Sequence, residues 1–177
     1  MAGNNLKLLL EIDARLSYRM RVAERPGKLR TCAAILAHSG DSWFWLLGLI
    51  FLWLLGNQTW KDRALFWAIG ILVTAIVVLI TKFIVRRKRP EGEWGSIYRS
   101  TDPHSFPSGH AARAVMLAVM AIGVGTAWLA VVLIVWAPLV CLARVAMGLH
   151  YLSDVLAGVL FGLVLGIGVE YGLGLAL

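Results

Sequence analysis

Long apolar stretches recur along this chain and limit what it can fold into. They lie at about residues 43–55, 64–85, 108–123, 127–147 and 153–176. A helix needs about 20 mostly apolar residues to cross the hydrocarbon core of a bilayer. Inside lipid, only helices and closed barrels satisfy all of their own backbone hydrogen bonds. We therefore predict an all-α, polytopic transmembrane bundle with five to six spanning helices.

The composition agrees with an integral membrane protein. Of 177 residues, 59% are hydrophobic and only 15% are charged, which is more apolar surface than a soluble domain of this size needs. The net charge of +7 then indicates membrane orientation and contact with anionic lipid headgroups, and we expect no nucleic-acid partner. Cys32 and Cys141 stand far apart in apolar surroundings and match no metal or redox motif, so we expect no structural disulfide.

The N-terminal residues 4–25 differ from the rest, because leucines and basic residues alternate there. This pattern predicts an amphipathic helix that lies in the membrane interface. Pro26 and Gly27 end it, and a short surface helix over 28–40 follows. We divide the chain into an interfacial segment, 1–41, and a transmembrane domain, 42–177. The apolar face of the predicted amphipathic helix carries Leu6, Leu9, Leu10 and Leu16.

Small and aromatic residues add detail to the predicted bundle. Gly158, Gly162 and Gly166 stand four apart in the last apolar stretch, so they share one face of a helix. Such a small-residue face predicts close packing against a neighbouring helix. Trp43 and Trp60 mark opposite membrane interfaces.

Three polar clusters stand at the ends of apolar stretches, at residues 82–89, 108–110 and 144–154. Tracing five spans through the membrane brings all three clusters to the same face. Ionisable residues at a membrane edge are costly, so their default interpretation is functional. Three clusters that converge on one edge are harder to explain by chance than a single cluster.

The last cluster suits nucleophilic chemistry. His150 and Asp154 are four apart, so on one helix they share a face, where the carboxylate can hold one imidazole nitrogen and leave the other free to attack. Arg144 supplies a planar fork for phosphate oxygens. The alternative is an ordinary helix start, with Asp154 as its cap and His150 as an interfacial residue.

Together the three clusters predict an anion site. Cations and the amides of a helix N-terminus bind phosphate, and two histidines give two roles: one attacks phosphorus, and the other protonates the leaving oxygen. Clustered carboxylates or cysteine–histidine sets that suit a metal are not apparent, so we expect no cofactor.

The same residues resemble a known family. Lys82-x6-Arg89-Pro90, Pro107-Ser108-Gly109-His110 and Arg144-x5-His150-x3-Asp154 are similar to the three signature motifs of the type 2 phosphatidic acid phosphatase (PAP2) superfamily. They occur in the family's order, and the resemblance covers roughly residues 42–177. It implies a membrane phosphatase that hydrolyses a lipid phosphate through a phosphohistidine, without a metal.

The resemblance also implies roles for single residues. His150 would be the nucleophile, Asp154 would orient it, and His110 would protonate the leaving group. The implied phosphate-binding set is Lys82, Arg89, Ser108, Gly109 and Arg144. Ala143 departs from the family, which often has serine before the arginine of the third motif. This departure puts one accessory hydrogen bond in doubt, but not the chemistry.

Several alternatives remain open at this point. The superfamily includes soluble vanadate-dependent haloperoxidases, which the apolar spans argue against. A non-catalytic lipid-phosphate binding or transport protein could keep the pocket without turnover. Candidate substrates are polyprenyl phosphates or diphosphates of the cell envelope, phosphatidylglycerophosphate and phosphatidic acid.

Other polar residues near the motifs are assigned roles outside the chemical step. We interpret Arg86, Arg87 and Lys88 as charges at the membrane surface. Arg113 reaches either a substrate headgroup or a structural ion pair. We interpret His104 as a loop residue, with gating or substrate contact as the alternative.

The distribution of positive residues also predicts the orientation of the protein in the membrane, which we expect to be a bacterial or archaeal plasma membrane. In the five-span scheme the N-terminus and the motifs share one side, and the other side has only Lys61 and Arg63 in its loops. The positive-inside rule then places the site at the cytoplasmic face. The cations on the motif side are Lys7, Arg15, Arg19, Arg21, Arg25, Lys28, Arg30, Arg86, Arg87, Lys88, Arg89 and Arg99.

Overall fold

The computed structural model describes residues 2–92, 94, 100–124 and 126–173, and this part of the chain is helical. Its only β-type pairing is an isolated bridge between Lys88 and His104. The predicted all-α class is therefore confirmed. The helices are α1 (Ala2–Arg19), α2 (Lys28–Ser39), α3 (Ser42–Leu55), α4 (Gln58–Val85), α6 (Gly109–Val124), α7 (Ala127–Ala146) and α8 (Leu152–Gly172).

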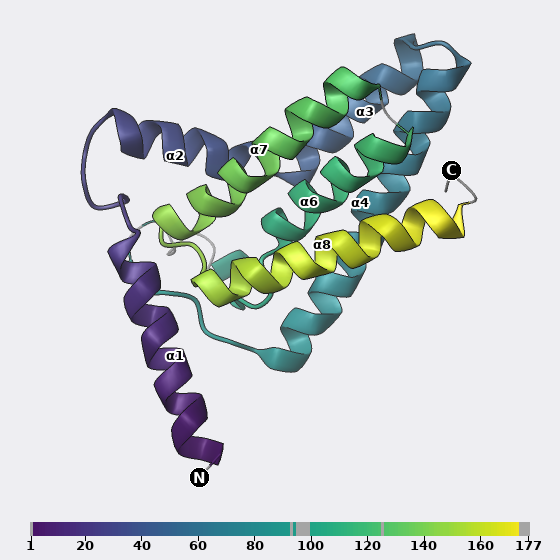
Figure 1. Cartoon of the computed structure of the whole chain (residues 1–177). Helices are drawn as coiled ribbons and strands as arrows, with labels where there is room; N and C mark the ends of the chain where they lie inside the picture. The colour runs from purple at the N-terminus through teal and green to yellow at the C-terminus, as the bar shows by residue number, and fades with distance from the viewer. Residues whose placement is uncertain (1, 93, 95–99, 125, 174–177) are drawn as a thin grey trace.

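Helix α6 is the centre of the bundle, and it packs against α4, α7 and α8 (Figure 1). Ala111, Ala114, Met116 and Leu117 on α6 are completely buried. Helix α3 packs on α4, and α2 packs along α7. Helix α1 extends away from the bundle and contacts it through the start of α8 (Figure 1).

The number of spanning helices differs from the prediction. Among the described residues, three helices are long and apolar enough to cross a membrane: α4, α7 and α8. Helices α2 and α3 pass the same test only as one bent pair, with an angle of 59° between them, which makes four. Helix α6 is apolar but too short. The prediction of five to six spans is therefore wrong by this measure, because the stretches at 43–55 and 108–123 form helices shorter than a bilayer.

The glycines of α8 let it approach α6 closely, as their spacing predicts. A Cβ added to Gly158 would lie 2.5 Å from the carbonyl oxygen of Ser108, and one added to Gly162 would lie 2.4 Å from that of Ala112. Neither contact is possible for a real side chain. The approach lets the backbone N–H of Ser108 donate to the carbonyl of Asp154 at 2.9 Å. The second and third motifs are thus joined directly.

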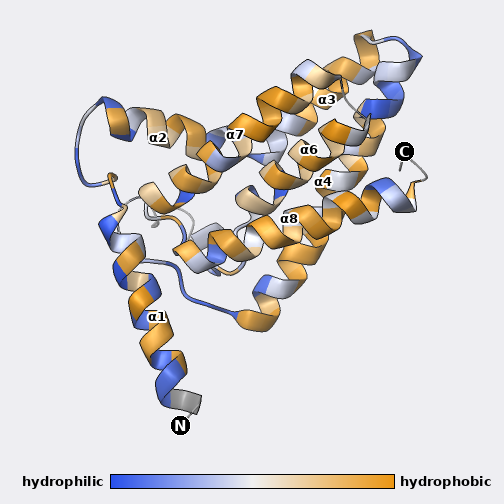
Figure 2. Ribbon diagram, viewed as in Figure 1, coloured by the Kyte–Doolittle hydropathy of each residue, from blue (hydrophilic) through white to orange (hydrophobic). Residues whose placement is uncertain are grey.

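Helix α1 has the predicted amphipathic character, with hydrophobic and hydrophilic residues alternating along it (Figure 2). Its leucines are exposed, whereas Ser17 is buried. The Ser17 hydroxyl accepts a hydrogen bond from the N–H of Leu152 at 2.8 Å, at the first residue of α8. The predicted interfacial helix is therefore also attached to the bundle by polar contacts.

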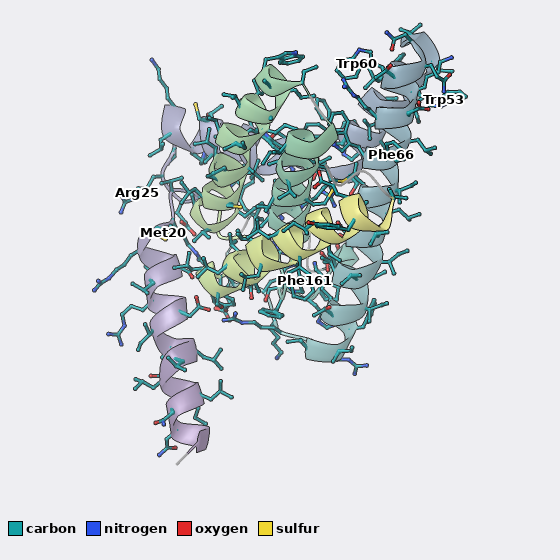
Figure 3. All side chains as sticks on the ribbon, turned by 45° about the vertical axis from the view of Figure 1, so that its right-hand side comes forward. Met20, Arg25, Trp53, Trp60, Phe66 and Phe161 are labelled. Atoms are coloured by element: carbon teal, nitrogen blue, oxygen red, sulfur yellow. The ribbon has the colours of Figure 1, made fainter. Side chains whose placement is uncertain are left out.

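The two ends of the bundle carry different side chains. Trp53 and Trp60 lie near the turn between α3 and α4, away from Met20 and Arg25 (Figure 3). At this end the ammonium of Lys61 lies 5.6 Å from the centre of the Trp53 ring. Amphipathic aromatic side chains of this kind gather at membrane interfaces. The three motifs lie at the opposite end, with the N-terminal segment.

Candidate active site

The three polar clusters meet around one cavity of about 160 Å³. It contains residues from all three motifs, so the predicted convergence is present in the structure. One wall is apolar and belongs to α4, and the opposite wall is polar. The lining residues are Thr74, Ala75, Val78, Leu79, Lys82, Asp102, Gly109, His110, Arg113 and His150.

His150 lies in the turn between α7 and α8, and both of its ring nitrogens are engaged. Gly148 makes this turn with φ +64°, a left-handed conformation that glycine adopts without strain. Nδ1 lies 2.8 Å from the carbonyl oxygen of Ser105, so Nδ1 carries the proton and donates it there. The guanidinium of Arg89 lies 3.2 Å from Nε2 and donates to it. The Nε2 lone pair therefore points into the cation cluster.

The surroundings keep this imidazole neutral. Burial, followed by the positive charges of Arg144, Arg89 and Lys82, lowers the pKa of His150 well below the usual 6.5. A neutral imidazole with its proton fixed on Nδ1 is the form that can attack with Nε2.

Asp154 lies close to His150 but does not hold it in the way the sequence predicted. Its carboxylate is 3.8 Å from His150 Nδ1, beyond hydrogen-bond distance. The reason is local: α8 begins at Leu152, so His150 precedes the helix and does not share its face. Asp154 instead accepts from the N–H of Tyr151 at 2.9 Å, as a helix-capping carboxylate.

Lys82 and Arg89 converge on the carboxylate of Asp102. The Lys82 ammonium donates to Asp102 Oδ2, and Arg89 Nη2 lies 2.7 Å from the same oxygen. Arg89 also donates to the carbonyl of Leu149 at 2.9 Å, which fixes it beside His150. Two buried cations therefore share one anion at the wall of the cavity.

The remaining predicted residues surround the same point. Ser108 is completely buried, and its hydroxyl accepts from the N–H of Ala111 at 3.4 Å at the start of α6. Arg144 is also completely buried and donates to the carbonyl of Ala37 at 3.1 Å. His110, one residue into α6, lines the same cavity as His150. Of the predicted site residues, Lys82, Gly109, His110 and His150 line the cavity, and Arg89 contacts His150, whereas Ser108, Arg144 and Asp154 do not line it.

Sequence reasoning missed Ser105, whose carbonyl holds His150, and four charged residues: Arg87, Asp13, Asp41 and Asp102. Arg87, interpreted as a membrane-surface charge, is 18% exposed and lies 2.7 Å from the carboxylates of both Asp154 and Asp13. That interpretation is wrong for Arg87, although Arg86 is exposed. Asp41 lies against His110, and Asp102 against the cations. No local sequence pattern marks these acids, because each partner is at least 13 residues away in the chain.

Arg113 and His104 take less central positions. Arg113, one turn after His110, donates from Nη1 to the carbonyl of Gly40 and also lines the cavity. His104 packs its ring edge against Phe83 with 5.8 Å between ring centres, so it is a loop residue beside the site.

Comparisons with known proteins agree on the family. The model of the PAP2 superfamily matches residues 63–173. The decaprenylphosphoryl-5-phosphoribose phosphatase of Mycobacterium tuberculosis is 30% identical over 160 residues, which cover 88% of this chain and 86% of that protein. The chain therefore belongs to the PAP2 superfamily.

Solved structures show the same fold. The transmembrane PAP2-type phosphatidylglycerolphosphate phosphatase of Bacillus subtilis superposes with a TM-score of 0.76 at 23% identity, covering 94% of this chain and 87% of that one. Aquifex aeolicus LpxE gives a TM-score of 0.71 at 24% identity, covering 89% and 93%. The protein is an integral membrane lipid phosphatase.

We predict that Arg87→Gln lowers kcat/KM about tenfold or more. The substitution removes one charge-assisted bond to Asp154 and one to Asp13, each worth about 1.5–3 kcal/mol, and about 1.4 kcal/mol corresponds to a factor of ten. Steady-state hydrolysis in detergent measures the effect. Arg86→Gln removes the same charge from the neighbouring exposed position and should stay within about twofold of wild type. Equal losses in the two variants would mean that Arg87 acts only as a surface charge.

Proposed function

We propose that this enzyme hydrolyses a lipid-linked phosphate monoester through a covalent phosphohistidine on His150. The observation that carries the proposal is the geometry of His150. Its Nδ1–H is held by the Ser105 carbonyl, and its Nε2 faces the cations around the cavity. In the first step Nε2 forms a bond to phosphorus while the bond to the leaving oxygen breaks.

Positive charge supports the transferring group in this mechanism. Lys82, Arg89 and Arg144 supply cations at positions fixed by buried contacts, and such preorganised charge acts strongly where water is excluded. The backbone amides of the first turn of α6, from Gly109 onward, lie where the helix dipole favours an anion. An incoming phosphate competes with the Asp102 carboxylate for Lys82 and Arg89, since both already donate to it.

His110 serves as the proton donor and then as the acceptor. It lines the cavity with His150, so both imidazoles reach one bound phosphate. As the ester bond breaks, His110 gives its proton to the leaving oxygen. In the second step it takes a proton from water, which attacks phosphorus and releases His150 and inorganic phosphate. A non-catalytic lipid-phosphate binding protein would need neither the acid nor the nucleophile.

The expected substrate carries its phosphate on a headgroup in water. A cavity of about 160 Å³ is smaller than the ~300–1,000 Å³ typical of sites that enclose a drug-sized ligand, so it holds the phosphate and its nearest atoms. The apolar wall of α4 leaves the lipid tail on the bilayer side. The mycobacterial relative is named for a lipid-linked sugar phosphate. This class leads our list of candidates, ahead of polyprenyl phosphates and diphosphates, phosphatidylglycerophosphate and phosphatidic acid.

We predict that His150→Ala lowers turnover by at least about a thousandfold, because loss of a nucleophile removes the covalent route. Phosphate release from a panel of lipid phosphates, assayed side by side, measures both the loss and the preferred substrate. His104→Ala alters a histidine outside the cavity and should keep most of the activity. Retention of more than a few per cent of activity in His150→Ala would refute the nucleophile assignment, and faster turnover of a diphosphate would refute the monoester preference.

We also propose that the motif end faces the cytoplasm of a bacterial or archaeal plasma membrane. The N-terminal segment lies at this end, since Arg21 donates to the carbonyl of Glu91 at 2.7 Å. Its seven cations outnumber Lys61 and Arg63 at the opposite end, which favours the cytoplasmic side. Arg99, also counted on the motif side, lies outside the described residues. We propose that residues 1–41 form an interfacial segment and that residues 42–177 form the catalytic domain.

A cysteine placed at Glu91, with Cys32 and Cys141 replaced by serine, tests this orientation. Glu91 is exposed beside the first motif. We predict that a membrane-impermeant thiol reagent labels it only after the cells are opened. A second cysteine variant at Asp62, on the other end of the bundle, should be labelled in intact cells. The reverse pattern would place the site outside.

A further inference from the structure

The carboxylate of Asp41 makes a close contact with His110 from outside the catalytic cavity. Asp41 Oδ1 lies 2.5 Å from His110 Nε2. His110 lines the cavity that also contains His150, whereas Asp41 does not. The acid therefore contacts the imidazole from outside the cavity that the ring lines.

The break between α2 and α3 is held in place by several polar contacts. The two helices meet at 59°, and Asp41 is the last residue before α3. Trp136 Nε1 donates to the Ser39 hydroxyl, and Trp45 Nε1 donates to the Ser39 carbonyl, both at 2.9 Å. The bend is thus fixed next to α6 and α7.

Two arginines, one on α6 and one on α7, hold the same break between α2 and α3. Arg113 donates to the carbonyl of Gly40, one residue before Asp41, and Arg144 donates to the carbonyl of Ala37. A Cβ added to Gly40 would lie 3.3 Å from Cδ2 of His110, so the backbone itself packs on the imidazole. Asp41 is therefore positioned by the same residues that surround the phosphate site.

We propose that Asp41 is a positioning residue for the acid–base histidine, and that Asp41 and His110 act as a carboxylate–imidazole pair. The inference rests on the proposed role of His110. The carboxylate holds the proton on Nε2 and stabilises the imidazolium form. That leaves Nδ1 as the nitrogen that gives a proton to the leaving oxygen and later takes one from water. This is the logic of a general acid oriented by a third group.

The proposal adds a residue that lies outside the matched family model, which begins at residue 63. It also explains why the bent segment packs where it does, because α2 and α3 meet at the ring of His110. His38 Nδ1 lies 3.5 Å from the other oxygen of Asp41, at a half-exposed position. Asp41 thus bridges a histidine near the surface and one at the cavity.

A comparison of leaving groups distinguishes positioning from a merely structural role. An alkyl lipid phosphate needs its leaving oxygen protonated, whereas p-nitrophenyl phosphate needs little help. We expect Asp41→Asn to lower kcat on the lipid phosphate by about 10- to 100-fold, a part of the roughly 10²–10⁴-fold that acid–base catalysis supplies. The aryl phosphate should change by less than about threefold. Asp62→Asn, an exposed carboxylate at the far end, serves as the matched control.

A double variant tests whether Asp41 acts through His110. In a His110→Ala background, Asp41→Asn should cause no further loss on the lipid phosphate, because the pair is already broken. An equal loss on both substrates, or a full additional loss in that background, would overturn the proposal. Unchanged activity of Asp41→Asn would overturn it as well.

Two more results keep this test separate from the proposed function. If Asp41→Asn does not accumulate as folded protein, Asp41→Glu keeps the charge but shifts the carboxylate, and it should show a smaller loss with the same leaving-group dependence. A failure of the His110 assignment would appear in the single His110→Ala variant as equal losses on both substrates. If only the role of Asp41 is wrong, His110→Ala will still lose more activity on the lipid phosphate than on the aryl phosphate, whereas Asp41→Asn will lose equal activity on both.

Discussion

The close contact between α6 and α8 is the constraint on which this site depends. Gly158 and Gly162 allow the backbone of α6 to lie where any side chain on α8 would stand. This contact joins Ser108 of the second motif to Asp154 of the third by a backbone hydrogen bond. The amides that begin α6 and the imidazole that precedes α8 then face one cavity. Without the small residues, the two motifs would be separated by at least the thickness of a side chain.

Buried charge is the second constraint, and the structure satisfies it with acids from distant parts of the chain. Arg89 and Lys82 are each 5% exposed, and burial of unpaired cations would be costly. Asp102 accepts hydrogen bonds from both of these cations and offsets one of the two charges, while Asp13 and Asp154 flank Arg87. These pairs fix the cations at defined positions beside the cavity. Preorganisation of this kind is the main source of electrostatic catalysis.

Sequence reasoning predicted the helical class, the three motifs and their convergence, because each leaves a local pattern of apolar length or residue spacing. It could not predict that α8 begins after His150, since one residue of helix start decides whether His150 and Asp154 share a face. Contacts such as Arg87 with Asp13, 74 residues apart, leave no such pattern. The number of spans was overestimated because apolar composition does not distinguish a short helix beside the site from a full crossing.

We propose that the carbonyl of Ser105 fixes the proton of His150 on Nδ1 and leaves Nε2 to attack phosphorus. The most direct measurement is to identify the phosphorylated nitrogen in the trapped intermediate. The enzyme is mixed rapidly with an activated aryl phosphate and then quenched in alkali. The alkaline quench preserves phosphohistidine for ³¹P–¹⁵N correlated NMR. We predict a phosphoryl group on Nε2 of His150. A phosphoryl group on Nδ1, or on any other residue, would contradict it.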